Sequence, residues 1–286
     1  MSRRMLLTSI TLLIVVVLCS ALSAQGYPVY NVQKETQLYG NLKQGDIPVW
    51  GNVACGPTAA INSFVYLQNK YPTVYDSKLI GDADNDGIPN TYQDLIAVAN
   101  TLGGPNYMNT IAMNTTWHDD FIWGKRAYIE QVAPNVTTYA AQDFWNWNNP
   151  QRPKPAWVQQ GYPTWDFLYN ELLNCQDVEI LLTWGDGGHY LTLTSFHWSD
   201  LDWDGIIDQN ENAWIDYIDP CTGAWGQTNI WHSFVGGGQW KIETNYYSSW
   251  ISMAVKESPV PEPGSLLVLG SGLASLLGLF RKTRRA

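Results

Sequence analysis

Residues 178–197 read VEILLTWGDGGHYLTLTSFH, two runs of branched and aromatic residues joined by a glycine-rich linker. Apolar and polar residues partly alternate in both runs, and Gly-Asp-Gly-Gly separates them at 185–188. This pattern predicts an antiparallel β-hairpin. Two further strands are predicted at 214–218 (WIDYI) and 239–245 (QWKIETN). The C-terminal half is therefore expected to form an antiparallel sheet.

Helical patterns precede the hairpin. Apolar residues recur at helical spacing over 57–70, and Tyr71-Pro72 ends that run. Further helices are predicted at 91–103, 119–132 and 165–174. Helices followed by a meander of strands favour the α+β class.

The N-terminal 24 residues read as an export signal. A basic start at Arg3 and Arg4 is followed by an apolar run from Met5 to Leu18 and then by small residues. This order is typical of a cleaved signal peptide. A membrane anchor is the alternative, although the run is short for a span. Residues 1–24 are therefore left out of the predicted fold.

The C-terminal residues 259–286 have three parts in a fixed order. Pro261-Glu262-Pro263 precedes an apolar stretch over 266–280, and four cations follow it. This order resembles the PEP-CTERM sorting signal, which an exosortase reads and cleaves in Gram-negative bacteria. The resemblance implies a transmembrane segment in the inner membrane with its basic end in the cytoplasm. It also implies a protein exported to the cell envelope or beyond, anchored transiently by its C-terminus. A permanent tail anchor is the alternative.

The part of the chain between the two signals is strongly acidic. Six of the 16 basic residues and one of the 26 acidic residues lie in the terminal segments, so residues 27–258 carry 10 bases and 25 acids. A net charge of -15 makes nucleic acid an unfavourable partner and suits bound divalent cations. We predict that 27–258 is one domain.

Three cysteines remain after the signal peptide, and Cys55 stands at the predicted start of the 57–70 helix. The positive end of a helix dipole favours the thiolate, which is the nucleophilic form of cysteine. Outside the cytoplasm two of the three cysteines can pair. Cys175 and Cys221 are the plausible disulfide, because it would tie the helix before the hairpin to the strand ending at Asp219.

A nucleophilic cysteine needs a base and a residue that orients the base. His189 opens a predicted strand directly after two glycines, where its ring can face a cleft. Asp219 on the following strand is placed to accept a hydrogen bond from that ring, and Asp216 on the same strand is the alternative. The other histidines have no motif around them and read as structural or surface residues: His118, His197 and His232.

These motifs together resemble the papain-like cysteine peptidases of the bacteriocin-leader-processing type. The resemblance rests on CGPTA at 55–59, GGHYLTLTSF at 187–196 and a strand that ends in Asp219-Pro220. It implies a papain-like fold, in which an N-terminal helical part with the nucleophile at a helix start packs on an antiparallel sheet. It also implies that an upstream glutamine completes the oxyanion hole. Gln44 is that candidate, with Asn52 as the fallback.

The predicted function is an exported, calcium-binding cysteine peptidase that hydrolyses a peptide or protein substrate through a Cys-His-Asp triad. Two alternatives remain open. One is an inactive, calcium-stabilised binding or extracellular-matrix protein on the same fold. The other is an amidase or acyl transferase that uses the same triad.

Two acidic segments repeat the pattern of an EF-hand calcium loop, with acids at positions one, three and five and glycine at six. They are DADNDGIPNTYQ at 82–93 and DLDWDGIIDQNE at 200–211. The predicted ligands of the second loop are Asp200, Asp202, Asp204, the Ile206 carbonyl, Asp208 and Glu211. Those of the first loop are Asp82, Asp84, Asp86, the Ile88 carbonyl, Asn90 and Gln93.

The first loop is expected to bind calcium more weakly, because Gln93 replaces the bidentate acid at position twelve unless Asp94 substitutes for it. The second loop lies between the strands of His189 and Asp219. We hypothesise that calcium there holds the two strands in register and so supports the triad.

Overall fold

The computed structural model describes residues 28–260. The predicted signal peptide and the predicted C-terminal transmembrane segment therefore lie outside the described residues. Between residues 28 and 260, no helix combines the length and the hydrophobicity needed to cross a bilayer.

In residues 28–260 the chain forms a nine-stranded sheet. All neighbouring strands run antiparallel except β2 and β3, which are parallel. The strands are β1 (Val29–Gln33), β2 (Thr137–Asp143), β3 (Val158–Gln160), β4 (Asp177–Trp184), β5 (Gly187–Ser199), β6 (Ala213–Asp219), β7 (Ala224–Gly236), β8 (Gln239–Thr244) and β9 (Trp250–Pro259).

Six of these strands close on themselves. β4 through β9 pair in sequence order, and β4 then pairs with β9, so that Asp177 lies opposite Glu257. β1, β2 and β3 are three additional strands at the edges of this closed sheet. The predicted papain-like, helix-on-sheet fold is therefore wrong. The sequence pattern did not reveal β7 and β9 as strands, and these two strands complete the ring.

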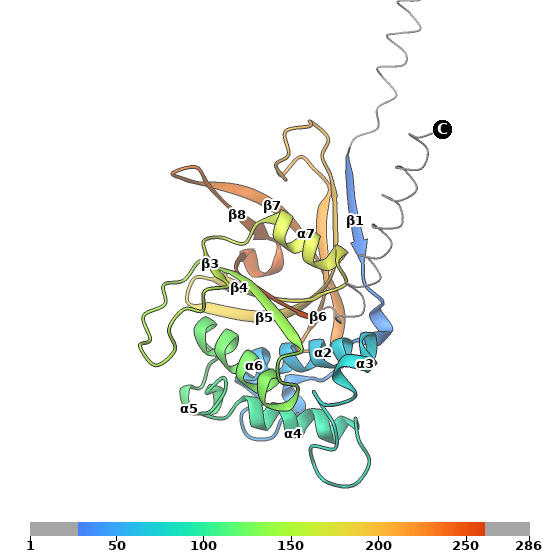
Figure 1. The fold of residues 1–286 in the computed structure, drawn as a ribbon. Coiled ribbons are helices and arrows are strands. Elements are labelled where there is room, and N and C mark those ends of the chain that lie inside the picture. The colour runs from blue at the N-terminus through green and yellow to red at the C-terminus, as the bar shows by residue number, and fades with distance from the viewer. Residues whose placement is uncertain (1–27, 261–286) are drawn as a thin grey trace, which may run out of the picture.

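The hairpin and the long helices agree with their predicted positions. β4 and β5 pair from Val178–Leu193 to Trp184–Gly187 around the turn at Gly185 and Asp186. In Figure 1 most of the helices gather at one end of the closed sheet, while α7 lies on its flank near β1. The helices are α2 (Cys55–Lys70), α3 (Pro72–Tyr75), α4 (Tyr92–Leu102), α5 (Thr110–Met113), α6 (His118–Val132) and α7 (Trp165–Leu173), with short 3-10 turns η1 (Thr36–Leu38), η2 (Gln44–Asp46), η3 (Gly51–Val53) and η4 (Tyr246–Ser248).

Both faces of the central hairpin are buried, because the two faces of each strand serve different cores. On β4, Leu181 joins the core under the helices, whereas Ile180 and Leu182 face the second core. On β5, Tyr190 joins the helical side and Leu191 the second core. Successive side chains of a strand point to opposite faces, so these near-continuous apolar runs supply both cores.

A buried ion cluster fastens α6 to the sheet. The Lys125 ammonium lies 3.1 Å from Asp177 Oδ2 and 2.5 Å from both Glu179 carboxylate oxygens, and it also contacts Glu257. All four residues are buried. Burial raises the pKa of Glu179 to about 7, although Lys125 opposes that shift. Burial lowers the pKa of Lys125, but its three acidic neighbours reverse this and raise it overall. Nothing in the local sequence pattern pointed to this cluster.

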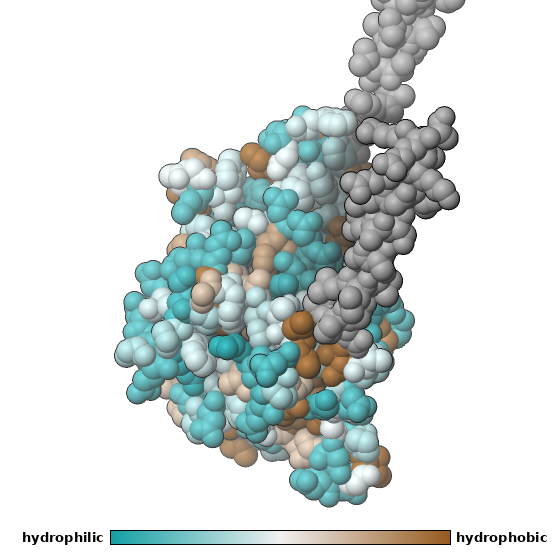
Figure 2. Space-filling model, in the orientation of Figure 1, coloured by the Kyte–Doolittle hydropathy of each residue, from teal (hydrophilic) through white to brown (hydrophobic). Residues whose placement is uncertain are grey.

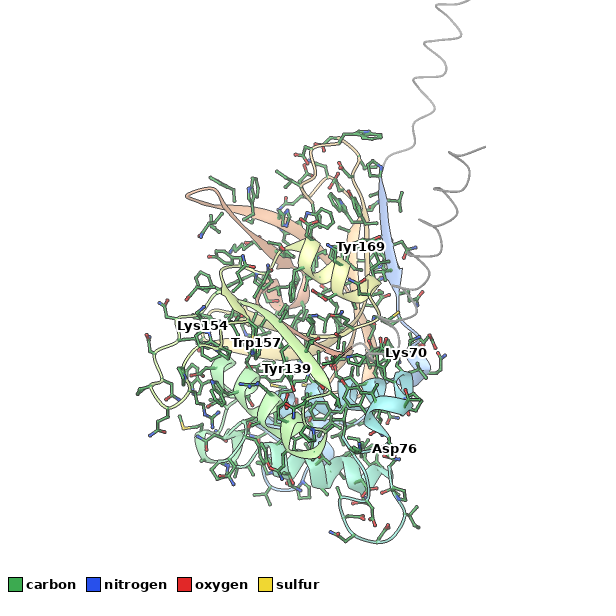
Figure 3. The ribbon with its side chains drawn as sticks, viewed as in Figure 1. Lys70, Asp76, Tyr139, Lys154, Trp157 and Tyr169 are labelled. Atoms are coloured by element: carbon green, nitrogen blue, oxygen red, sulfur yellow. The ribbon has the colours of Figure 1, made fainter. Side chains whose placement is uncertain are left out.

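Aromatic stacking and a polar exterior complete the fold. Tyr139 on β2 stacks on Trp157 with ring centroids 5.4 Å apart, and both are labelled in Figure 3. The face of the molecule in Figure 2 is largely hydrophilic, with smaller apolar patches. This surface agrees with the strong excess of acids over bases in the domain.

Candidate active site

Cys55 is the first residue of α2, as the sequence predicts, and it is half-buried. Two contacts hold this helix start against its neighbours. The Thr192 hydroxyl on β5 donates to the Ala59 carbonyl (2.9 Å), and a Cβ on Gly56 would come within 2.8 Å of Thr116 Oγ1. Glycine at 56 therefore allows a close approach that any side chain would prevent. The thiol accordingly sits where α2 meets β5.

The structure brings Cys55, His189 and Asp219 together. His189 is 6% exposed near the start of β5, and its Nε2 lies 2.8 Å from Asp219 Oδ1 at the end of β6. The Cys55 thiol lies close enough to the His189 ring that each group shifts the pKa of the other. Because Asp219 occupies Nε2, Nδ1 is the ring nitrogen available to Cys55. This arrangement has the order of nucleophile, base and orienting acid.

The protonation of this trio follows from its contacts. Burial raises the pKa of Cys55, but hydrogen bonds from His189 and from the backbone N–H groups of Tyr190 and Gly56 lower it overall. Burial disfavours the charged His189 ring, yet its bonds to Asp219, Cys221 and Cys55 raise the pKa of His189 to about 12. The arrangement therefore keeps the His189 ring protonated around neutral pH and favours the thiolate of Cys55 more than an isolated thiol would.

Asp219 is held by a tight turn and by an aromatic neighbour. Its Oδ1 accepts from the Cys221 backbone N–H (2.8 Å), and its Oδ2 accepts from the Tyr246 hydroxyl (3.2 Å). The Tyr246 ring stacks on His189 with centroids 5.9 Å apart and planes 7° apart. Burial raises the pKa of Asp219, but its hydrogen bonds, led by that from His189, lower it overall. Asp219 thus stays a carboxylate that orients the ring.

Asp216, the alternative to Asp219, lies elsewhere. Its Oδ2 accepts from the Ser195 hydroxyl (2.5 Å), and His197 Nε2 is 3.5 Å from the same oxygen. His197 also stacks on Trp214 with centroids 4.7 Å apart. Ser195 is 1% exposed, whereas Asp216 and His197 are half-buried, so this second network is a partly buried support between β5 and β6.

Gln44 lies beside the turn that carries Asp219. Its backbone N–H donates to the Pro220 carbonyl (2.8 Å), and its Nε2 is 3.4 Å from the Asn52 carbonyl. The Gln44 side chain is buried, and its Oε1 accepts no hydrogen bond among the described residues. Asn52, the fallback donor, is exposed in η3.

The predicted disulfide between Cys175 and Cys221 does not form, because all three cysteines of the described chain are free thiols. Cys175 precedes β4, which starts opposite Leu193, whereas Cys221 follows Asp219 at the His189 end of β5. Those two positions on β5, His189 and Leu193, are four residues apart, about 13 Å at the usual rise per residue. A disulfide needs Cα atoms within about 7 Å.

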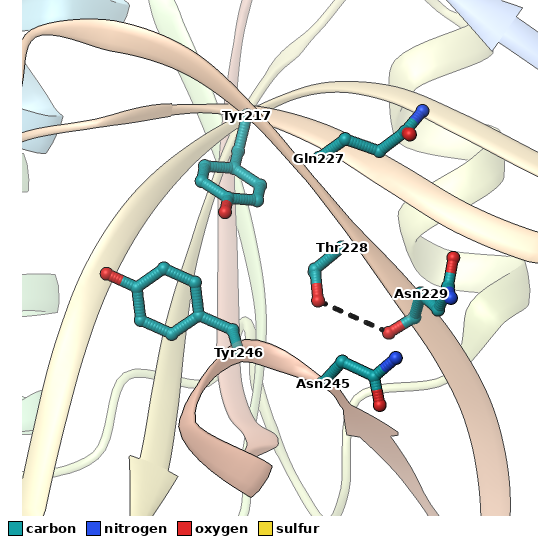
Figure 4. A pocket seen from close by; sticks show the side chains of 6 residues that line it. All are labelled: Tyr217, Gln227, Thr228, Asn229, Asn245 and Tyr246. Atoms are coloured by element: carbon teal, nitrogen blue, oxygen red, sulfur yellow. Dashed lines mark hydrogen bonds between the residues drawn. The ribbon is translucent and has the colours of Figure 1, made fainter.

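A polar pocket of about 350 Å³ adjoins the site behind Tyr246. In Figure 4 the Tyr217 and Tyr246 rings form one wall and amide side chains form the other. Thr228 Oγ1 donates to the Asn229 carbonyl (3.4 Å) within that wall. The pocket is lined by Tyr217, Gln227, Thr228, Asn229, Asn245 and Tyr246.

A second histidine–aspartate pair stands at the start of α6, and sequence reasoning assigned it only a structural or surface role. His118 Nδ1 lies 2.6 Å from Asp143 Oδ2, which also accepts from Trp147 Nε1 (2.7 Å). Asp143 is fully buried at the end of β2. No motif around either residue signalled the pair, because 24 residues of intervening chain separate them.

The second acidic loop brings three of its predicted ligands together. Oxygen atoms of Asp200, Asp202 and Glu211 lie within 4.8 Å of one another. Glu211 is oriented by the Leu201 N–H (2.7 Å) and the Trp198 indole (2.5 Å). The remaining acids, Asp204 and Asp208, are outside that group and accept backbone N–H bonds within the loop.

The first acidic loop groups Asp82, Asp84 and Asp86 within 4.8 Å. The other predicted side-chain ligands of this loop, Asn90 and Gln93, do not join the group. The Asn90 side chain bonds to Gln68 and Ser77 instead, and Gln93 is exposed. Asp94 is buried and serves as the capping-box acid of α4. In Figure 1 the two acidic loops lie at opposite ends of the molecule.

Comparison with known proteins identifies the C-terminal end of the chain. Residues 259–285 match the PEP-CTERM protein-sorting motif, beginning at the last residue of β9. No curated protein matches the chain. The chain is therefore exported, sorted by an exosortase and anchored transiently at the membrane by its tail before processing.

Proposed function

We propose that the exported domain is a cysteine peptidase that hydrolyses peptide bonds through Cys55, His189 and Asp219. The observation that carries the proposal is that Cys55 at a helix start lies beside the His189 ring, whose Nε2 is 2.8 Å from Asp219 Oδ1. A thiolate beside an imidazolium is the ground state that such chemistry requires.

In the proposed mechanism the Cys55 thiolate attacks the peptide carbonyl carbon and forms a C–S bond. The tetrahedral intermediate collapses, the C–N bond breaks, and the imidazolium of His189 protonates the leaving amine. His189 then takes a proton from water, whose oxygen attacks the thioester and releases the carboxylic acid product with the thiolate. Asp219 acts as a positioning residue throughout.

The developing oxyanion needs donors near Cys55. An amide nitrogen carries two hydrogens, and the contact of Gln44 Nε2 with the Asn52 carbonyl uses one of them. The second hydrogen is the donor we assign to the oxyanion, with Gln44 held in place through its bond to Pro220. Loss of one such donor slows acyl transfer by roughly 100- to 1,000-fold in other enzymes.

Acyl-enzyme trapping tests the proposed function. Full-length protein, purified in detergent, is mixed with an activated ester. The mass of the peptide that carries Cys55 is then measured by mass spectrometry. We expect a stoichiometric acyl adduct on Cys55 and turnover of a quenched-fluorescence peptide library. Added amine acceptors separate hydrolysis from acyl transfer by the products they form.

The matched control is Cys175→Ala, which removes another half-buried thiol. It should retain the adduct and the turnover, whereas Cys55→Ala should lose both. Absence of an adduct on Cys55 in the wild-type protein would falsify the peptidase proposal and favour a binding protein.

We also propose that the second acidic loop binds calcium. The support is the grouping of Asp200, Asp202 and Glu211 within 4.8 Å in an EF-hand sequence pattern. The loop joins β5 to β6, and its Asp200 N–H is bonded to the Pro28 carbonyl (3.0 Å). Bound calcium would fix the spacing of the two strands that carry His189 and Asp219.

Calcium is expected to raise the melting temperature of the domain. At a calcium concentration 100-fold above Kd, binding adds about 2.7 kcal/mol to the free energy of unfolding. For a domain of this size that corresponds to roughly 5–10 °C, read by thermal unfolding with calcium or chelator. Glu211→Gln should lose most of the shift and Glu243→Gln, on β8, should keep it. Equal shifts in the two variants would place the calcium effect outside this loop.

A further inference from the structure

Cys221 adds a second thiol to the site, and the peptidase mechanism does not use it. Its sulfur, a ring nitrogen of His189 and a carboxylate oxygen of Asp219 lie within 4.8 Å of one another. We propose that these three side chains form a zinc site and that bound zinc switches off Cys55. The regulatory half of this inference rests on the proposed peptidase function, whereas the zinc site itself does not.

The turn after β6 holds Cys221 in place. The Asp219 carbonyl accepts from the N–H groups of Thr222 (3.1 Å) and Gly223 (2.7 Å), and Asp219 Oδ1 accepts from Cys221 N–H (2.8 Å). Gly223 has φ +64°, and a Cβ there would come within 2.6 Å of the Asn41 carbonyl oxygen. Glycine is thus required at 223, and the turn fixes the backbone of Cys221 next to Asp219.

The donor set matches zinc in chemistry and in size. Imidazole nitrogen, carboxylate oxygen and thiolate sulfur are the three ligand types that zinc takes in proteins. Bond lengths of about 2.0–2.3 Å place ligand atoms of a tetrahedral site roughly 3.3–3.6 Å apart. The present spacing, with His189 Nε2 2.8 Å from Asp219 Oδ1, needs only small side-chain shifts. Cys221 is exposed, which leaves an entry path and room for water as fourth ligand.

The other clusters of acidic side chains in the described chain differ from the His189 cluster in the ligand atoms that they offer. The Lys125 ammonium already fills the centre of Asp177, Glu179 and Glu257. Both acidic loops offer only oxygen atoms, which suit calcium. Within residues 28–260, the cluster at His189 therefore stands apart, because it combines nitrogen, oxygen and sulfur ligands. Excess calcium should not displace zinc from it.

Zinc binding has a direct chemical consequence for Cys55. The metal takes the place of the proton on His189 Nε2 and of the Cys221 thiol proton, and both protons pass to solvent. The bound ring is neutral and cannot serve as the imidazolium that protonates a leaving amine. Cys55 also loses the positive partner that favours its thiolate. Zinc should therefore slow both substrate turnover and alkylation of Cys55.

The test compares zinc binding and Cys55 alkylation in three proteins: full-length wild type, Cys221→Ser and Cys175→Ser. Serine keeps the backbone N–H that bonds Asp219, so the turn is preserved. ZnCl₂ is titrated against a chromophoric chelator in excess calcium, which occupies the acidic loops. Iodoacetamide alkylation of Cys55 is followed by peptide mass with and without zinc.

We expect wild type and Cys175→Ser to bind one zinc ion that slows Cys55 alkylation at least tenfold. Cys221→Ser should bind zinc at least tenfold more weakly and should show no slowing at the same zinc concentration. Equal zinc affinity in wild type and Cys221→Ser overturns the site, and zinc that binds without slowing alkylation overturns the switch. Alkylation without zinc reports separately on the proposed function, so an unreactive Cys55 would count against the peptidase while the affinities still decide the zinc site.

Discussion

Replacing His189 with alanine is expected to slow the alkylation of Cys55 at least tenfold at pH 6.5. The wild-type thiolate persists below the pH of an ordinary thiol, because the contact with His189 lowers the pKa of Cys55 and the imidazolium stays protonated well above neutrality. Without the ring, burial raises the pKa of the thiol. An ordinary thiol with a pKa near 8.5 is only about 1% ionised at pH 6.5.

The rate of Cys55 alkylation will differ less between wild type and His189→Ala than the thiolate fraction does, because a thiolate of low pKa is intrinsically less nucleophilic. The measurement is the iodoacetamide rate at Cys55 from pH 5 to 10. The two proteins should differ most at acidic pH and converge above about pH 9.5. His197→Ala is the matched control, because His197 is also on β5 and pairs with an aspartate of β6. A wild-type profile in His189→Ala would show that no ion pair exists.

Replacing Lys125 with methionine is expected to lower the free energy of unfolding by about 3–5 kcal/mol at pH 7. The substitution leaves Asp177, Glu179 and Glu257 buried without their counterion, and breaking a buried ion pair from one side has a cost of this size. Urea unfolding followed by tryptophan fluorescence measures the change. The whole sheet should unfold at a lower urea concentration, because the cluster joins α6 to β4 and β9.

The pH dependence gives the sign of this effect. Burial raises the folded-state pKa values of Glu179 and Glu257 above their unfolded values. The contribution of Glu179 is then fully present below about pH 4.5 and is lost as pH rises through about 7, and that of Glu257 is likewise lost as pH rises. Removing Lys125 raises both pKa values further. The loss of unfolding free energy in Lys125→Met should thus be smaller at pH 5 than at pH 8.

The control is Lys70→Met, at the exposed pair with Glu35 (Lys70 is labelled in Figure 3). It should lower the free energy of unfolding by no more than about 1 kcal/mol. A similar loss of unfolding free energy in Lys125→Met and Lys70→Met would show that the buried cluster contributes no more to stability than an exposed ion pair.

The features that could be read from the sequence are those determined by neighbouring residues. The helix start at Cys55, the hairpin over 178–197 and the two acidic loops each depend on residues within a few positions of one another. Local structure can be predicted from such patterns without knowing the rest of the fold. They are a proline in the first helical turn, glycines in a tight turn and acids at alternate positions. The sorting motif at 259–285 is of the same kind.

The choice between Asp216 and Asp219 depended on the strand register. The two residues are three apart, so they face opposite sides of β6, and Asp219 shares the side of Ile215 and Tyr217. An irregularity between Leu193 and Ser195 shifts the pairing of β5. It turns His197 to the side of Asp216, although an unbroken strand would keep it on the side of His189. No sequence period reveals such a bulge.

Only the tertiary structure decided which strands pair, which cysteine lies beside His189 and which buried charges form one cluster. β4 pairs with β9 across 80 residues of chain, and that contact closes the sheet, which the sequence predicted only to be antiparallel. An alternating strand specifies which side chains are buried but not which partner its backbone N–H and C=O groups will find. The same β4–β9 pairing brings Glu257 to Lys125. The β5–β6 pairing places Cys221 beside His189, whereas Cys175 lies near the other end of β5. Local chemistry thus determined the parts of the site, and nonlocal backbone pairing determined their assembly.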